Sequence, residues 1–299
     1  MLTVHTNVSA RQSASGLARS TAALQQSMSR LGTGYRVSSA MDDAAGLQIA
    51  VRLDAQSRGM TVAMRNTQNA ISLFQTADGA LSEVTGILLR MKDLATEAYN
   101  ETSSSSDKAA MQGEFDALGR ELRNVIVNTS FGGQRLFDPT PSGGSPSGLL
   151  AKGSVTFQIG STAAEQVSFD ASSAIQALTG DGTGLGWMAY SFRSTSLDTD
   201  YGLEFTLLPN GFIQTISQAI DDVSSLRSQF GAFSNRLDHT FGNLSNMVSN
   251  TTAAKGRILD TDYAAEAVSM ATSQMKAQAA GTMLKSSKSL VDLATLLVR

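Results

Sequence analysis

Apolar residues recur in steps of three and four over long stretches of this 299-residue chain. This spacing places successive side chains on one face of an α-helix, and a helix that keeps it over many turns packs lengthwise against others. Residues 42–100 are predicted to form one very long helix, with this pattern at Phe74, Ala77, Leu81, Val84, Leu88, Met91 and Ala95. The pattern returns at Met111, Phe115, Leu118, Leu122 and Val125, and again from Ile213 to Val248. The fold class is therefore mainly α, built on a long antiparallel helical bundle.

Both ends of the chain carry shorter heptad patterns. Near the start these are Leu17, Leu24, Met28 and Leu31, and near the end they are Met283, Leu290 and Leu297. We expect paired N- and C-terminal coiled-coil helices. Because an isolated pair with so few large apolar residues would be marginally stable, we expect other copies of the chain to complete these assembly seams. The alternative is a self-contained antiparallel coiled coil.

Residues 31–50 connect the first heptad segment to the long helix. One of two glycines, Gly32 or Gly34, is predicted to end the first helix, and Asp42 or Asp43 to begin the next, since aspartate oxygens accept the free N–H groups of a first helical turn. We expect Arg36 to bond to these aspartates or to a neighbouring subunit. Residues 1–65 carry seven arginines and three aspartates, a net charge of +4. These arginines either bind carboxylates and carbonyls of neighbouring chains or lie on solvated helix faces.

The middle of the chain has a different character. All four prolines fall within residues 139–209, and alternating apolar residues predict strands at 154–160 and 166–170, with further candidates at 188–192 and 202–208. This small β-containing insert suggests three domains. They are a terminal coiled-coil domain (1–41 and 263–299), a helical bundle domain (42–138 and 210–262) and a variable outer surface domain (139–209).

Several kinds of function are disfavoured by composition. There is no cysteine and there are only two histidines, which leaves little room for a metal site or a histidine base. The glycine-rich residues 180–187 precede no helical pattern, so they indicate a loop and not a phosphate cradle. A net charge of -3 gives no argument for nucleic acid or an anionic membrane, and no stretch approaches 18 uninterrupted apolar residues. We therefore expect no enzymatic activity, no cofactor, no metal, and no nucleic-acid or membrane partner.

Several segments, in order, resemble motifs of the bacterial flagellins. Residues 31–50 (LGTGYRVSSAMDDAAGLQIA) resemble the N-terminal signature of that family, with Asp-Asp-Ala-Ala-Gly complete at 42–46 and with Tyr35 and Ser38 as departures. Residues 129–138 (TSFGGQRLFD), 231–246 (GAFSNRLDHTFGNLSN), 260–267 (DTDYAAEA) and 293–299 (LATLLVR) resemble later family motifs. The resemblance covers residues 1–138 and 210–299 and looks like that of lateral or swarming-type flagellins.

This resemblance implies a structural subunit that polymerises with itself into the filament of the bacterial flagellum. It also implies an extracellular location, type III export without a cleaved signal peptide, a chaperone on the C-terminal helix, and contacts with junction and cap proteins. Residues 1–16 agree, since they lack the basic start and apolar run of a secretory signal. The alternatives are a hook–filament junction protein or, in another class, a secreted coiled-coil adhesin or effector.

The resemblance also suggests a contact with the vertebrate Toll-like receptor. Residues 88–98 (LLRMKDLATEA) keep Arg90 and Leu94 of the family's recognition segment, and residues 112–116 keep Glu114. Arg90 and Leu94 lie four residues apart, on one helix face beside the apolar stripe. We expect this face to contact a neighbouring subunit in the filament and the receptor in a released monomer.

Overall fold

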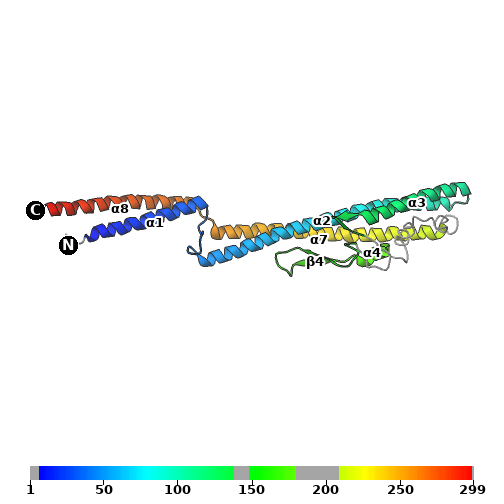
Figure 1. The fold of residues 1–299 in the computed structure, drawn as a ribbon, viewed down its shortest axis with the longest axis horizontal. Coiled ribbons are helices and arrows are strands. Elements are labelled where there is room, and N and C mark those ends of the chain that lie inside the picture. The colour runs from blue at the N-terminus through cyan, green and yellow to red at the C-terminus, as the bar shows by residue number, and fades with distance from the viewer. Residues whose placement is uncertain (1–6, 138–147, 180–208, 298–299) are drawn as a thin grey trace. The chain divides into compact units, whose positions relative to one another are not determined.

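The computed structural model describes residues 7–137, 148–179 and 209–297, without side chains for 176–179, 209–212 and 290–297. Its contacts divide the chain into two compact units: a terminal unit of residues 1–57 and 248–299, and a central unit of residues 58–247. In chain order the elements are α1 (Val8–Thr33), α2 (Ala44–Ala98), α3 (Ser105–Asn128), β1 (Ser130–Phe131), β2 (Gln134–Arg135), β3 (Val155–Gln158), β4 (Gln166–Phe169), α4 (Ser172–Thr179), α7 (Pro209–Leu259) and α8 (Tyr263–Leu297) (Figure 1). The predicted mainly α fold with a small strand-containing insert is confirmed.

The apolar stripe of α2 forms the core of the central unit. All seven predicted residues, from Phe74 to Ala95, are at most 2% exposed. On α7 the predicted stripe is buried at Ile216, Val223, Leu226, Phe230, Phe233, Leu237 and Leu244. The two helices run antiparallel, since Phe74 contacts Phe233 while Asp78, one turn later, accepts a 2.8 Å bond from Arg227.

The third helix of this bundle, α3, has its buried face slightly rotated from the predicted one. Phe115 and Leu122 are buried as predicted, but Met111, Leu118 and Val125 are only partly buried, and Gln112, Gly119 and Ile126 take their places. Ser104 begins this helix in a capping box, because its hydroxyl accepts from the Asp107 N–H while the Asp107 carboxylate accepts from Ser104. Asp107 is thus the third helical residue.

Two antiparallel β-hairpins come after α3 in the chain. β1 pairs with β2 across Gly132 and Gly133, whose φ values of 58° and 83° need glycine and suit a two-residue hairpin turn. β3 pairs with β4, as predicted, and their Phe157 and Phe169 rings pack against Phe74, Phe230 and Phe233 of α2 and α7, with centroids 4.7–6.2 Å apart. The strand candidates at 188–192 and 202–208 lie outside the described residues.

In the terminal unit, α1 and α8 pack antiparallel, because Asn7 bonds to Ser287 while Arg30 pairs with Glu266 (Figure 1). The expected pairing of the two ends of the chain is therefore confirmed. α7 continues to Leu259, and only residues 260–262 separate it from α8. The three-domain division remains a prediction.

Candidate assembly surface

The seam between α1 and α8 is built mostly from small side chains. The less exposed residues of α1 recur in steps of three and four, at Ala10, Ser13, Leu17, Ser20, Leu24, Ser27 and Leu31. Those of α8 do the same at Glu266, Met270, Ser273, Ala277, Ala280, Leu284 and Ser287. Among the described side chains of α1 and α8, Ser27 and Ser273 are the only buried ones, so these parts of the two helices bury little apolar surface against each other.

Two predicted seam residues lie outside this contact. Met28 is 52% exposed and Met283 is 64% exposed, each one position away from a residue of the seam. Leu17, Leu24 and Leu31 lie on the seam, while the side chains of Leu290 and Leu297 lie outside the described residues. The heptad spacing thus located one face of α1 correctly, whereas Met28 and Met283 are exposed beside the seam, and Met283 lines the edge of the groove between the two helices.

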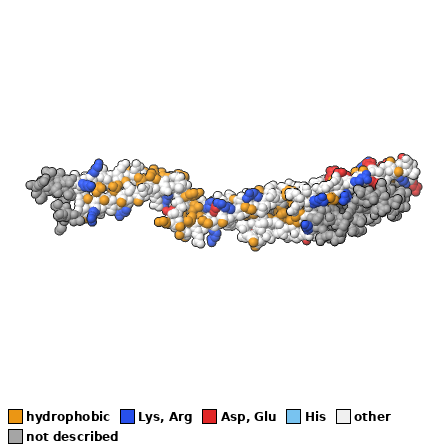
Figure 2. All heavy atoms as spheres, in the orientation of Figure 1, with side chains coloured by type: hydrophobic (Ala, Val, Ile, Leu, Met, Phe, Trp, Pro, Cys, Tyr) orange, Lys and Arg blue, Asp and Glu red, His pale blue; other side chains and the backbone are white. Residues whose placement is uncertain are grey.

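Large apolar side chains are exposed over much of the terminal unit (Figure 2). Those of the described residues are Val8, Met28, Tyr35, Met41, Ile49, Val51, Tyr263, Val268, Met275 and Met283. In contrast, the only apolar residues buried among the described side chains of this unit are Val37 and Ala50. Such an arrangement is typical of a surface that another protein covers.

Two connectors join the helices of this unit and bond to each other: residues 34–43 between α1 and α2, and residues 260–262 between α7 and α8. Gly34, at φ 76°, ends α1, and the next residue, Tyr35, forms an antiparallel bridge with Asp260. The Arg36 N–H donates to the Leu259 carbonyl at 2.6 Å, and Thr261 N–H donates to the Gly34 carbonyl at 2.9 Å. Tyr35 therefore contributes its main chain, and its ring is 46% exposed.

The Arg36 side chain has a different partner from the one predicted. Its Nη2 donates to the Ile258 carbonyl at 2.8 Å, and within the described residues it makes no ion pair with Asp42 or Asp43. The reason is geometric: the connectors place Arg36 beside the last turn of α7, where free carbonyl groups accept hydrogen bonds. Its expected bond to a neighbouring subunit is untested.

The two aspartates act separately at the start of α2. Asp42 accepts from the N–H groups of Ser38 and Ser39, and these backbone bonds, Ser39 first, hold the pKa of the Asp42 carboxyl below its ordinary value. Asp43 precedes the helix and accepts from the Gly46 N–H at 2.8 Å, the bond of a helix N-cap. A Cβ on Gly46 would overlap the Asp43 carboxylate, so the glycine makes room for the cap.

The three residues suggested as a receptor contact are not equivalent. The Arg90 Nε and Nη2 atoms lie 2.8 and 2.7 Å from Glu114 Oε1, and both side chains are about half exposed. Leu94 is only 2% exposed and belongs to the core of the bundle. Its expected place on an accessible face is therefore wrong, because the buried stripe of α2 is wide enough to include Leu94 beside Met91 and Ala95.

In the part of the chain that the structure describes, His, Cys, Asp and Glu side chains form no group of three or more that could hold a metal ion. None of the described helices is apolar over a length that would cross a membrane.

Comparison with known proteins agrees with the sequence motifs. Residues 4–141 match the bacterial flagellin N-terminal helical region, and residues 213–293 match the bacterial flagellin C-terminal helical region. Flagellin D of Vibrio cholerae is 31% identical over 95% of this chain and 96% of its own length, and flagellin A of the same species is 32% identical over the full length of both. A structure from Vibrio parahaemolyticus, described as a flagellar hook-associated protein, has a TM-score of 0.57 at 16% identity, covering 73% of this chain and all of its own.

The hook-associated structure is similar in fold alone, whereas the flagellins match in sequence from end to end. The matched regions together span well over half of the chain. The chain therefore belongs to the bacterial flagellins, the structural subunits that form the flagellar filament.

Proposed function

We propose that copies of this chain polymerise by covering one another's terminal units. The observation that carries the proposal is the contrast within that unit: its described residues expose ten large apolar side chains, and Val37 and Ala50 are the only apolar ones among them that are buried. Apolar surface removed from water stabilises a contact by about 25 cal/mol per Å². Met28 and Met283, which are exposed beside the α1–α8 seam, are thus available to a neighbouring copy, as are Val268 and Met275.

Seeded growth tests this proposal. Filaments are dissociated by heat or acid, short fragments are added as seeds, and electron microscopy measures the tubes that form. Variants that lack residues 1–31 or 268–299 are expected to stay monomeric. Growth of either truncated variant at the rate of the intact chain would show that assembly does not depend on the terminal helices.

A substitution that keeps both helices gives a sharper test. We expect Met28→Gln with Met283→Gln to slow growth while leaving monomer stability nearly unchanged, since exposed substitutions usually alter it by less than about 0.5 kcal/mol. Tyr99→Gln is the matched control, because Tyr99 is 49% exposed at the end of α2 in the central unit. If the control slows growth as much as the methionine pair, the effect is not specific to the terminal unit.

The export route and the remaining partners belong to the same proposal. We infer type III export without a cleaved signal peptide, with a chaperone that binds α8 and covers its exposed Val268, Met275 and Met283 before assembly. Co-purification of the chain with its chaperone, with and without residues 268–299, tests this. The proposal fails if the truncated chain binds equally well. Junction and cap proteins would meet the same terminal surfaces at the two ends of a filament.

We further propose that the Arg90–Glu114 face is open to a vertebrate Toll-like receptor when the monomer is free. The half-exposed ion pair between α2 and α3 supports this, and Leu94 takes no part. Receptor-bearing cells treated with wild-type and Arg90→Ala monomer provide the test. Equal activation by the two proteins, or none by the wild type, contradicts the proposal.

A further inference from the structure

Sulfur occurs in this chain only in methionine side chains. There are 12 methionines and no cysteine, so no thiol of the chain competes for an oxidant. An accessible thioether is oxidised to methionine sulfoxide, which turns a flexible apolar side chain into a polar one. The exposure of each methionine therefore decides where an oxidant acts on this protein.

The methionines differ in exposure between the two units. In the central unit, Met60 and Met91 are 1% and 0% exposed. In the terminal unit, by contrast, Met28 on α1 and Met275 and Met283 on α8 are each more than half exposed. We call these last three the terminal methionines. A small oxidant in solution therefore reaches the sulfur atoms of the terminal methionines, while the bundle shields those of Met60 and Met91.

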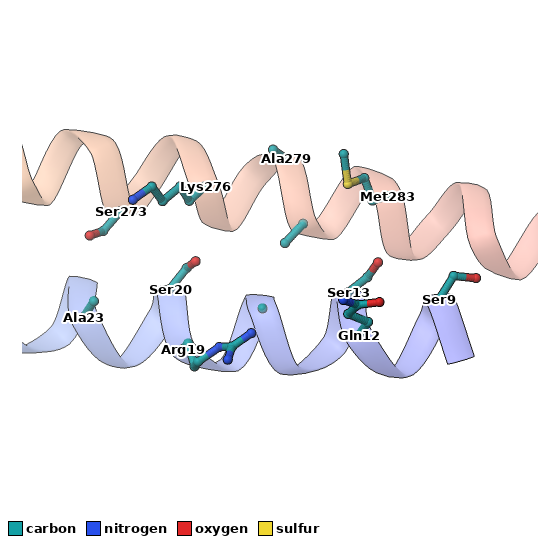
Figure 3. A pocket seen from close by; sticks show the side chains of 12 residues that line it. Ser9, Gln12, Ser13, Arg19, Ser20, Ala23, Ser273, Lys276, Ala279 and Met283 are labelled. Atoms are coloured by element: carbon teal, nitrogen blue, oxygen red, sulfur yellow. The ribbon is translucent and has the colours of Figure 1, made fainter. Parts of the chain in front are cut away.

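Met283 is also accessible from the side of the partner helix. It lies at the edge of a groove of about 700 Å³ between α1 and α8 (Figure 3). The groove stays open because Ser13, Gly16 and Ala280, which also line it, are small. A water molecule takes up about 30 Å³ of liquid volume, so the groove admits a peroxide molecule together with solvent.

We propose that the terminal methionines of the free monomer are oxidation sites, and that their conversion to sulfoxides by hydrogen peroxide stops polymerisation. The sulfur lone pair attacks one peroxide oxygen, and the S–O bond forms as the O–O bond breaks. The departing hydroxide takes the proton from the transferred oxygen and leaves as water. Sulfur loses two electrons and the peroxide gains them, so the step needs no further reactant.

The block to polymerisation rests on the proposed function, in which a neighbouring copy covers these side chains. In the monomer, water solvates the new S=O group, so the fold is expected to be unaffected. In the filament, the same group would be buried against apolar side chains without a hydrogen-bond donor, which is unfavourable. Oxidation is thus tolerated by the monomer and opposed by the contact between copies, and a subunit that is already covered is protected from it.

Peptide mass spectrometry of peroxide-treated monomer tests the assignment of the sites. We expect the terminal methionines to be oxidised at least about tenfold faster than Met60 and Met91, because exposure governs susceptibility. In assembled filaments, oxidation of the same three is expected to slow by at least about tenfold, since a covered side chain is reached only after dissociation. Equal rates at the terminal and the buried methionines of the monomer would overturn the assignment.

Seeded growth of the treated full-length chain tests the effect on polymerisation. With untreated seeds, growth of oxidised monomer is expected to slow by at least about tenfold while its circular dichroism stays that of the untreated protein. Methionine sulfoxide reductases of both stereospecificities, with dithiothreitol as the reductant, should restore growth to within about twofold. Unchanged growth of fully oxidised monomer would overturn the proposal.

A leucine variant links the effect to the three sites. Leucine is close to methionine in volume and has no sulfur to oxidise. Met28→Leu with Met275→Leu and Met283→Leu is expected to grow equally fast with and without peroxide. The matched control is Met41→Leu with Met247→Leu, which removes two exposed methionines outside α1 and α8 and should remain sensitive. If peroxide slows the triple variant as much as the wild type, or if the control is protected, oxidation elsewhere is responsible and the proposal is wrong.

Failure of this proposal is distinguishable from failure of the proposed function. If untreated wild-type monomer adds to no seed, polymerisation through the terminal unit fails, and the block to polymerisation fails with it. The mass spectra still decide whether the terminal methionines are the oxidation sites. If the wild type grows with and without peroxide, polymerisation stands and control by oxidation is overturned.

Discussion

At the scale of single residues, Arg90 and Leu94 show how narrow the boundary between core and surface is on α2. They lie four residues apart, which is slightly more than one turn, so Leu94 is rotated by about 40° from Arg90. That rotation is enough to bury Leu94 at 2% exposure while Arg90 remains half exposed beside Glu114. In a motif that contains both residues, Leu94 therefore stabilises the core, while Arg90 is available for contacts at the surface.

Substitutions at these two positions are expected to differ in stability. Leu94→Ala removes a buried side chain and should lower the free energy of unfolding by about 2–5 kcal/mol. Arg90→Ala breaks an exposed ion pair and should lower it by at most about 1 kcal/mol. Thermal unfolding followed by circular dichroism compares the two variants. A Leu94→Ala protein as stable as Arg90→Ala would contradict the assignment of Leu94 to the core.

Gly46 provides a second prediction at this scale. Alanine usually stabilises a helix relative to glycine by about 1 kcal/mol, but at position 46 its Cβ would displace the Asp43 cap, a loss of about 0.5–2 kcal/mol. We expect Gly46→Ala to speed hydrogen exchange in the first turns of α2. Gly79→Ala is the control on the same helix, since nothing lies within 4 Å of its Cβ, and it should slow local exchange. Slower exchange in both variants would contradict the close approach of Asp43.

At the scale of elements, regular spacing predicted the long helices well because burial follows helical period. The stripe from Phe74 to Ala95 is buried at every predicted position. The same reasoning was less accurate on α3, where Gly119 and Ile126 join the buried face in place of Leu118 and Val125. Packing against the rest of the bundle sets that small rotation, and periodicity alone cannot.

The phenylalanine cluster shows another limit of the sequence. Alternation predicted β3 and β4, but nothing in it indicated that Phe157 and Phe169 would meet Phe74 and two rings of α7. These contacts join residues more than 60 positions apart. Main-chain contacts are equally hard to predict from sequence, since the bridge between Tyr35 and Asp260 requires no particular side chain.

Removal of one ring of this cluster should loosen the insert. Phe169→Ala deletes a buried aromatic side chain, a change that typically lowers the free energy of unfolding by about 3–5 kcal/mol. We expect faster proteolysis within residues 148–179 and a lower unfolding temperature. Ser168→Ala, on the exposed face of the same strand, is the control and should resemble the wild type. Equal proteolysis of the two variants would mean that the ring does not hold the hairpin to the bundle.

At the scale of the whole molecule, the two units differ in how much core they possess. The central unit contains the connected apolar core from Ala70 to Leu237, whereas the seam of the terminal unit is largely serine and alanine. A segment with few buried apolar contacts opens more readily than a packed core. In a monomer the terminal unit is therefore the less stable part.

Limited proteolysis should reveal this difference. We expect the first cuts in the monomer to fall within residues 1–57 and 248–299, leaving a resistant fragment that contains the bundle of α2, α3 and α7. In filaments the terminal cuts should slow by at least about tenfold, because a covered helix must first dissociate to open. Equal rates in monomer and filament would show that the terminal helices gain no protection from assembly.

The paired connectors have a mechanical consequence. A single extended linker can swivel about its own backbone bonds, and torque applied to one of its ends is lost as rotation. Here residues 34–37 and 259–261 run side by side and are joined by main-chain bonds, with the Arg36 guanidinium as a further tie. Twist applied to the α1–α8 pair is therefore passed to the adjoining ends of α2 and α7 through two connecting segments at once.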